Sequence, residues 1–83
     1  MKVVVKRKDH SIPVEIITEY IKLQDAMKLA NAAATGGEAK LLIQDGLVTV
    51  NGEICEMRGK KLYPGDQFAY QGQSYRICGH EAE

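Results

Sequence analysis

The sequence predicts a small α+β domain in which two short helices pack against a small, mostly antiparallel β-sheet. Apolar residues recur at helical spacing between Leu23 and Ala33, which indicates an amphipathic helix. The stretch Thr35-Gly36-Gly37-Glu38 is a capping box, so we expect a second helix over about Gly37–Asp45. Asn51-Gly52 separates two strand-like runs and is a strong β-hairpin signal. At 83 residues, we expect the chain to form one domain, residues 1–83.

The N-terminal part is expected to add a β extension over about residues 1–20. Lys2–Arg7 is rich in valine and is typical of a strand. Asp9-His10-Ser11 reads as a turn, and Pro13–Ile17 as a second strand. Pro13 fits the start of a strand because proline cannot donate a hydrogen bond to a β-ladder.

The first helix is predicted from one apolar stripe on its surface. Asp25 and Lys28 lie three residues apart and are expected on its outer side. The stripe consists of positions i, i+3, i+4 and i+7, which are Leu23, Ala26, Met27 and Ala30. The small residues that follow, up to Ala34, would allow another element to approach closely.

The second helix is expected to be capped by Thr35, whose side chain accepts from the Glu38 amide, while Glu38 reaches back. Gly46 is a left-handed stop after Asp45. Gly36 and Gly37 have two explanations. The spacing favours close packing against the alanine-rich end of the first helix. The alternative is that bare amides at a helix N-terminus attract an anion such as phosphate.

The remaining elements alternate between strand patterns and turn signals. In order, we expect a strand at Leu47–Val50, a return strand at Glu53–Cys55, a loop at Met57–Lys61, a turn at Pro64–Asp66, and strands at Gln67–Tyr70 and Ser74–Cys78.

No catalytic or metal-binding pattern is found. The sequence has no GxSxG, P-loop or HExxH motif, and we expect neither enzyme activity nor a cofactor. Cys55 and Cys78 do not form a CxxC pair, and His10 and His80 lie elsewhere. A structural zinc site needs four closely spaced ligands, so we expect reduced, packed thiols and no metal.

The apolar runs are too short for a membrane span, which needs about 20 residues. No apolar stretch follows the basic start, so we expect no signal peptide and a cytoplasmic protein. The 11 basic and 11 acidic residues balance to zero net charge. Any basic surface must therefore arise from segregation of charges within the fold.

One set of cations is placed to form such a surface if the two helices lie side by side on the sheet. Together these cations would bind phosphates; the alternative is that each is an ordinary solvated side chain. Glu38, Glu53 and Glu56 lie nearby and dilute the positive field. The set comprises Lys22, Lys40, Arg58, Lys60 and Lys61.

The stretch "IKLQDAMKLANAAATGGEAKLLIQDGLVTVNGEICEMRGKKLYPGD", Ile21–Asp66, resembles the S4-type RNA-binding domain. The shared order is a basic-Leu-Asp/Gln helix start, a short turn, a Ser/Thr-x-x-Glu-Ala-Arg/Lys helix, a Val-Asn-Gly hairpin and a Pro-Gly-Asp turn. "TEYIKL", "TGGEAK" and "RGKKLYPGD" look closest to the small stand-alone bacterial members, the YaaA/YbcJ-like proteins. The resemblance implies the S4-like (αL-type) fold, with its core at about residues 21–66.

In this family the RNA face is formed by the start of the first helix, the second helix and the nearby loops. Many members carry arginine directly after the cap, where this chain has Gly36. That change removes a cation but exposes backbone amides, which suggests a mixed role for the glycines. With the cationic loop, the expected RNA-binding residues are Lys22, Thr35, Gly36, Gly37, Lys40, Asn51, Arg58, Lys60 and Lys61.

The resulting functional hypothesis is non-catalytic binding of structured RNA, ribosomal RNA or a ribosomal particle, by a monomer. Recognition would depend more on shape than on sequence, as for duplex RNA. The alternative is a protein-interaction adaptor that uses the same fold without RNA, which zero net charge favours. A contiguous positive face would support the first, and a neutral face with an apolar patch the second.

Overall fold

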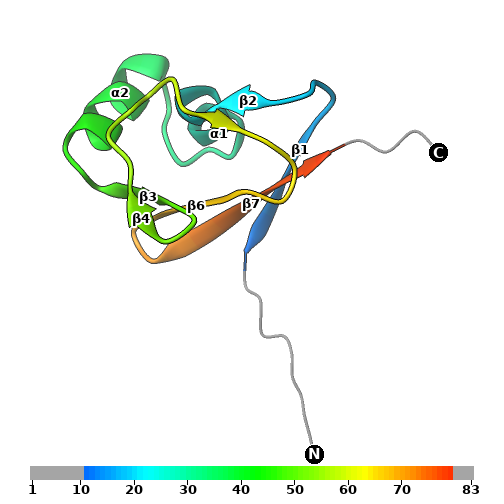
Figure 1. Ribbon diagram of the computed structural model, residues 1–83. Helices are drawn as coiled ribbons and strands as arrows, with labels where there is room; N and C mark the ends of the chain where they lie inside the picture. The colour runs from blue at the N-terminus through cyan, green and yellow to red at the C-terminus, as the bar shows by residue number, and fades with distance from the viewer. Residues whose placement is uncertain (1–10, 80–83) are drawn as a thin grey trace, which may run out of the picture.

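The computed structural model describes residues 11–79, which form two helices, a five-stranded sheet and a separate two-stranded sheet. In Figure 1 both helices lie on the same side of the larger sheet. That sheet has the order β1-β7-β6-β3-β4, and only the β1–β7 pair is parallel. The predicted α+β class and mostly antiparallel sheet are confirmed. The larger sheet contains β1 (Ile12–Ile16), β3 (Val48–Val50), β4 (Glu53–Ile54), β6 (Gln67–Tyr70) and β7 (Gln73–Gly79).

These strands agree with the sequence patterns to within a residue at each end, because turn residues bound them locally. The predicted strand Lys2–Arg7 and the turn residues Asp9 and His10 lie outside the described residues. β1, which the sequence analysis assigned to an N-terminal extension, forms one edge of the sheet, with Val14 paired to Ile77. Pro13 is compatible with this edge position because one side of an edge strand makes no ladder hydrogen bonds.

The smaller sheet was not predicted. β2 (Ile21–Lys22) and β5 (Lys61–Leu62) pair antiparallel, so the expected loop at Met57–Lys61 ends in a strand. Two-residue strands contain too few positions to show alternation, and this pair forms only because distant parts of the chain meet. Leu62 is fully buried, which anchors β5 to the core.

The first helix, α1 (Leu23–Leu29), is shorter than the predicted Leu23–Ala33. It stops because Asn31 adopts a left-handed conformation, with φ of 62°. The amide of Ala32 donates to the Met27 carbonyl at 2.8 Å, and the amide of Asn31 donates to Lys28 at 3.0 Å. These two bonds form a Schellman motif, usually built on glycine, which explains why the sequence pattern concealed it.

The second helix, α2 (Gly36–Gln44), confirms the capping prediction. The Glu38 amide donates to Thr35 Oγ1 at 3.1 Å, and the Glu38 carboxylate accepts from the Ala34 amide at 2.7 Å. The reciprocal bond thus reaches one residue further back than in the standard capping box. Gly46, with φ of 76°, ends the helix as expected.

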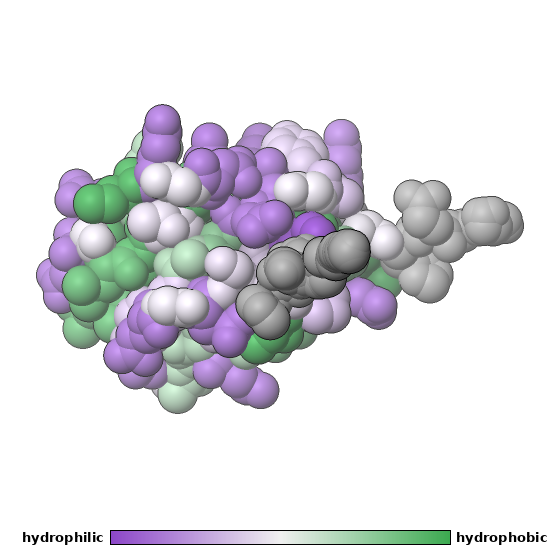
Figure 2. All heavy atoms as spheres, turned by 90° about the horizontal axis from the view of Figure 1, so that it is seen from below, coloured by the Kyte–Doolittle hydropathy of each residue, from purple (hydrophilic) through white to green (hydrophobic). Residues whose placement is uncertain are grey.

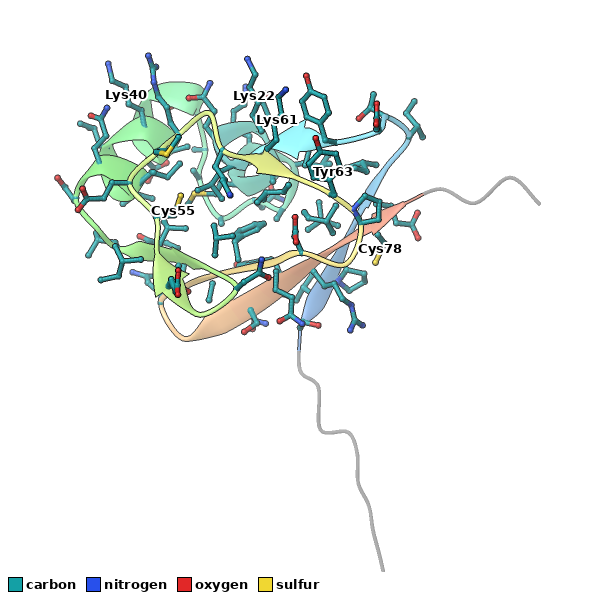
Figure 3. The ribbon with its side chains drawn as sticks, in the orientation of Figure 1. Lys22, Lys40, Cys55, Lys61, Tyr63 and Cys78 are labelled. Carbon is teal, nitrogen blue, oxygen red and sulfur yellow. The ribbon has the colours of Figure 1, made fainter. Side chains whose placement is uncertain are left out.

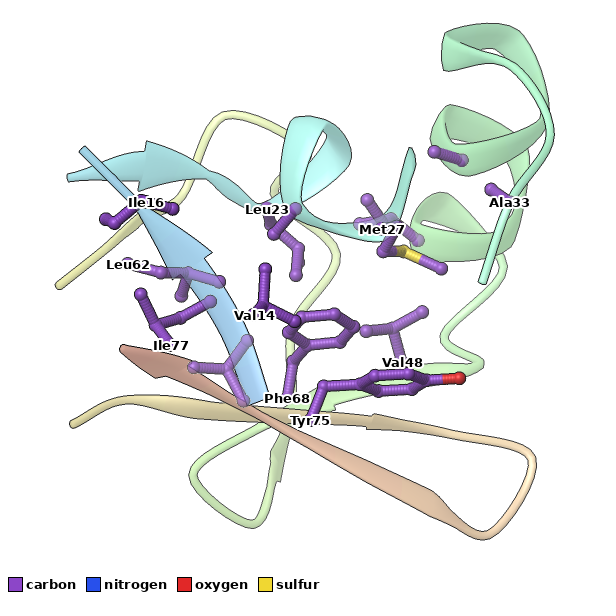
Figure 4. Packing of buried hydrophobic residues seen from close by; sticks show 14 residues of the cluster. Val14, Ile16, Leu23, Met27, Ala33, Val48, Leu62, Phe68, Tyr75 and Ile77 are labelled. Carbon is purple, nitrogen blue, oxygen red and sulfur yellow. The ribbon is translucent and has the colours of Figure 1, made fainter. Parts of the chain in front are cut away.

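The core fills the space between the helices and the larger sheet (Figure 4). The rings of Phe68 and Tyr75, on adjacent strands, stack with centroids 4.8 Å apart. Tyr75 is buried, so its ring serves packing. Both helices and β5 contribute to the same cluster, whose largest fully buried side chains are Phe68, Leu23, Met27, Ile43, Leu62, Ile77 and Val48.

The hairpin turn and the Pro-Gly-Asp turn are joined by side-chain hydrogen bonds. Asn51 Nδ2 donates to Asp66 Oδ1 at 3.3 Å, and Asn51 Oδ1 accepts from the Gln67 amide at 3.0 Å. The other oxygen of Asp66 accepts from the Tyr63 amide at 2.8 Å. Asn51 also has a left-handed φ of 51°, as a two-residue hairpin turn requires. Asn51 therefore braces two turns that are distant in sequence.

We expect Asn51→Ala to lower the free energy of unfolding by about 1–2 kcal/mol, through lost hydrogen bonds and an unfavourable left-handed alanine. Urea unfolding measures the change. Asn51→Gly is the matched control, because it removes the same bonds but tolerates the backbone conformation, and should lose less. Wild-type stability in the alanine variant would show that Asn51 does not brace the turns.

Candidate nucleic-acid interface

The β2–β5 pair brings together two lysines that are far apart in the sequence. Lys22 and Lys61 are directly opposite each other in the antiparallel register, and both are exposed. Like charges at opposed positions destabilise a strand pair. Lys28, by contrast, forms an ion pair with Asp25 at 3.7 Å, as the sequence predicted. The opposition of the two lysines therefore does not stabilise the strand pair, and an anionic ligand would relieve the repulsion between their ammonium groups.

The loop before β5 is held against the start of α1 by backbone hydrogen bonds. The Leu23 amide donates to the Lys60 carbonyl at 2.8 Å, and the Gln24 amide donates to the Arg58 carbonyl at 3.1 Å. The first amides of a helix have no partner within it, so the loop satisfies two of them. These amides are consequently occupied, and what this region offers an anion is its cationic side chains.

Lys40 extends from α2 toward the same edge. Figure 3 shows Lys40, Lys22 and Lys61 along the upper edge of the molecule. We call Lys22, Lys40, Arg58, Lys60 and Lys61 the cationic edge. Within residues 11–79, none of its members has an acidic partner within 4 Å. The fold thus concentrates positive charge that the neutral composition conceals.

The N-terminus of α2 supplies the glycines of the expected site. A Cβ on Gly36 would lie 3.9 Å from Lys28 Cδ and Nζ, and one on Gly37 would lie 3.9 Å from Thr35 Oγ1. These are ordinary contacts, so close packing does not require either glycine, and the packing explanation is wrong. The sequence predicts Lys28 on the outer face of α1. The structure also places its amino group beside the α2 N-terminus.

Two expected site residues are committed to structural bonds. The side-chain oxygen of Thr35 accepts from the Glu38 amide, and the Asn51 amide group holds the two turns together. Asn51 and Lys60 line one hollow, which the acidic side chains of Glu53 and Glu56 also line. Lys60 therefore shares with the hairpin a hollow of mixed charge.

Exposed apolar side chains form a surface, which we call the apolar face, that adjoins the cationic edge. Leu47, Ile54 and Met57 are all more than half exposed, and Ile54 and Met57 line the same hollow as Lys60. Figure 2, which views the molecule from below, shows apolar residues gathered at the end occupied by α2 and the β3–β4 hairpin. The molecule therefore carries both a positively charged surface, as expected for RNA binding, and an apolar surface, as expected for a protein partner.

The described residues contain no group of three or more potential metal ligands. Cys55 and Cys78 are free thiols on different parts of the fold (Figure 3). No helix within residues 11–79 is long and apolar enough to cross a membrane.

Comparison with known proteins identifies the family. The S4 domain pattern matches residues 14–78. The chain belongs to the S4 domain family. The probable ribosome maturation protein RlbA of Bacillus subtilis (strain 168) is 42% identical over 60 residues, covering 72% of this chain and 84% of RlbA. The resemblance of Ile21–Asp66 to S4 domains is thereby confirmed.

A solved structure shows the same fold. The solution structure of YbcJ from E. coli, described as revealing an αL motif involved in RNA binding, matches with a TM-score of 0.64. The match covers 92% of this chain and 98% of YbcJ, at 22% sequence identity. The S4-like fold expected from the YaaA/YbcJ-like resemblance is therefore present, and S4 membership supports RNA binding.

The opposed lysines allow a test of charge repulsion. Lys22→Glu should form an attractive cross-strand pair with Lys61 and raise stability by a few tenths of a kcal/mol at low salt. For a domain of this size that corresponds to a rise in Tm of about 1–3 °C. Thermal unfolding followed by circular dichroism measures it, and high salt should remove the gain by screening.

Lys28→Glu is the matched control, because it replaces the attraction to Asp25 by repulsion and should lower Tm. A salt-independent loss of stability in Lys22→Glu would show that the two lysines do not repel each other in the native fold.

Proposed function

We propose that this chain binds structured RNA without catalysing a reaction, and that its ligand is ribosomal RNA or a ribosomal particle. The observation that carries the proposal is the cationic edge, which gathers side chains from β2, α2 and the residues leading into β5, without acidic partners in the described fold. Membership of the S4 family supports RNA as the ligand. The name of its relative, a probable ribosome maturation protein, supports the ribosomal choice.

The proposed mechanism is a grip on phosphates. The opposed side chains of Lys22 and Lys61 would contact the backbone of one strand, while Lys40 reaches a second position from α2. Amides at the α2 N-terminus, left bare by Gly36 and Gly37, add an anion-binding contribution beside these cations. Such contacts read the geometry of an RNA helix, whose narrow major groove is closed to side chains.

The other expected residues take supporting parts in this proposal. Arg58 and Lys60 contribute charge from the loop that covers the start of α1. Thr35 positions the N-terminus of α2 through its cap, and Asn51 holds the hairpin in place. We further propose that the protein acts as a cytoplasmic monomer and needs no metal or cofactor.

The apolar face supports a second candidate function, a contact with another protein. Leu47 and Ile54 share one face of the hairpin, since Ile54 is opposite Thr49 and Leu47 precedes Thr49 by two residues. Exposed apolar patches mark interaction sites on many proteins. This surface adjoins the cationic edge at the hollow that Lys60 lines, so a protein partner bound there would lie next to the RNA.

RNA affinity should fall steeply with salt if phosphate contacts dominate. For about four contacts, log K against log salt should have a slope of about −3 to −4. Titrations of a ribosomal RNA fragment at several potassium concentrations measure it. Binding that does not depend on salt, or absence of binding at low salt, would favour the adaptor function.

Lys40→Glu should weaken RNA binding at least about tenfold, because an attractive phosphate contact becomes repulsive. Its melting temperature should stay within a few degrees of wild type, since surface substitutions usually change stability by about 0.5 kcal/mol or less. Lys40→Arg should retain binding. Gln71→Glu, in the exposed β6–β7 turn, controls for added negative charge. Unchanged affinity in folded Lys40→Glu would remove Lys40 from the interface.

A further inference from the structure

Two tyrosines extend the β2–β5 ladder beyond its lysine pair. Tyr20 immediately precedes β2 and Tyr63 immediately follows β5, so they face each other one step past the Ile21–Leu62 pair. Their ring centroids lie 5.7 Å apart at an interplanar angle of 48°. The amino group of Lys61 lies over one face of the Tyr20 ring, 4.8 Å from its centroid, and so occupies that face with a cation–π contact. The lysine pair and the tyrosine pair therefore form one continuous surface, part of which is seen in Figure 3.

The alternation of side chains explains why these residues share a face. Residues two apart on a strand point to the same side, so Tyr20 lies with Lys22, and Tyr63 with Lys61. Leu62, between Lys61 and Tyr63, points to the other side and is fully buried. The buried side of the ladder fixes the ribbon to the core. Its outer side presents two aromatic rings beside two ammonium groups.

The backbone that carries the two rings is held in place before any ligand binds. The Tyr63 amide donates to Asp66, and Pro64 lies against Gly79, where an added Cβ would be only 2.9 Å from Pro64 Cγ. On the other strand, the Thr18 hydroxyl donates to the Tyr20 carbonyl at 2.7 Å. Tyr63 nevertheless remains 43% exposed. A ring on a pre-ordered backbone loses less conformational entropy when a flat ligand stacks on it.

The charges around the rings favour a neutral base over a phosphate at this point. Glu19 and Asp25 line the hollow beside Tyr20, together with Thr18 and Lys22. Their carboxylates disfavour a phosphate beside Tyr20, whereas they do not repel an uncharged base on the neighbouring ring of Tyr63. The ammonium groups of Lys22 and Lys61, one step along the ladder, suit the phosphates that flank such a base.

We propose that one unpaired RNA base stacks on the exposed ring of Tyr63, which Tyr20 supports from the opposite strand, while Lys22 and Lys61 hold the neighbouring phosphates. The proposal rests on the RNA-binding function above and narrows its ligand to duplex RNA interrupted by a bulge or a splayed nucleotide. Unpaired bases in RNA are commonly bound by stacking on aromatic side chains. A cross-strand tyrosine pair also stabilises the ladder, so the test must separate stacking from stability.

The experiment uses three RNA hairpins with the same stem: one with a single bulged nucleotide, one with an abasic residue at the bulge, and one fully paired. Wild-type protein should bind the bulged RNA about tenfold more tightly than either control. Tyr63→Ala should lose this preference while binding the paired stem within about twofold of wild type. Tyr63→Phe, which keeps the ring, should retain the preference. Circular dichroism verifies that each variant is folded.

A 2-aminopurine at the bulge reports stacking directly. Its fluorescence should fall on binding wild type and stay high with Tyr63→Ala. Tyr20→Leu preserves apolar bulk on the second strand and should lose the preference for the bulged RNA, as Tyr63→Ala does. It tests the proposal if Tyr63→Ala does not fold.

The possible failures are distinct. Equal, salt-dependent affinity for all three RNAs would overturn the proposed stacking and leave RNA binding intact. A uniform loss of affinity in Tyr63→Ala for all three RNAs would also overturn it. If none of the three RNAs binds at low salt, the proposed function itself fails.

Discussion

The docking of residues 58–62 onto residues 21–24 is the contact on which the candidate site depends. Four backbone positions take part: two cross-strand pairs between β2 and β5, and two amides of α1 that donate to loop carbonyls. The loop thereby satisfies a helix start that has no side-chain cap. The same contact aligns Lys22 with Lys61 and Tyr20 with Tyr63. Without it, the cationic loop and the start of α1 would be unrelated parts of the surface.

This contact combines a strong anchor with an unfavourable charge pair. Leu62 and Leu23 are fully buried on the inner side, and apolar burial contributes about 1.5–3 kcal/mol for each large side chain. Opposed lysines on the outer side cost at most about 1 kcal/mol, and less when solvent screens them. Burial of the two leucines therefore outweighs the repulsion between the two lysines, which stay opposed in the native fold. Two adjacent ammonium groups without an acidic partner among residues 11–79 attract a polyanion.

The sequence predicted the parts of the fold that local chemistry determines. The Thr35 cap, the Gly46 stop and the Asn51-Gly52 turn follow from neighbouring residues and were correct. The end of α1 was missed because Asn31, rather than glycine, takes the left-handed position. β2 and β5 were missed because two residues cannot show a period, and their pairing joins segments about forty positions apart.

The candidate site was predictable in composition but not in arrangement. The cations could be identified from the sequence, while the opposition of Lys22 and Lys61 follows only from the strand register. Tyr20 was overlooked because it precedes an element too short to detect. Lys28 was assigned from its i, i+3 spacing to Asp25, and that pair exists. Spacing within one helix could not show that Lys28 also reaches the start of the other.

The position of Lys28 bears on the glycine that departs from the S4 pattern. The family resemblance places an arginine where this chain has Gly36, and the structure leaves room for a side chain there. The missing cation is therefore not a consequence of crowding. Lys28 Nζ lies 3.9 Å from the point where a Gly36 side chain would begin, so positive charge is still supplied at the α2 N-terminus from α1. A cation is unfavourable at a helix N-terminus, where the dipole is positive, so the benefit of Lys28 to stability comes from its ion pair with Asp25 and not from its place beside α2. Lys28 beside the α2 N-terminus and Lys22 opposite Lys61 thus lie where a helix dipole or a like charge disfavours them, and this supports a polyanionic ligand for the S4 domain despite zero net charge.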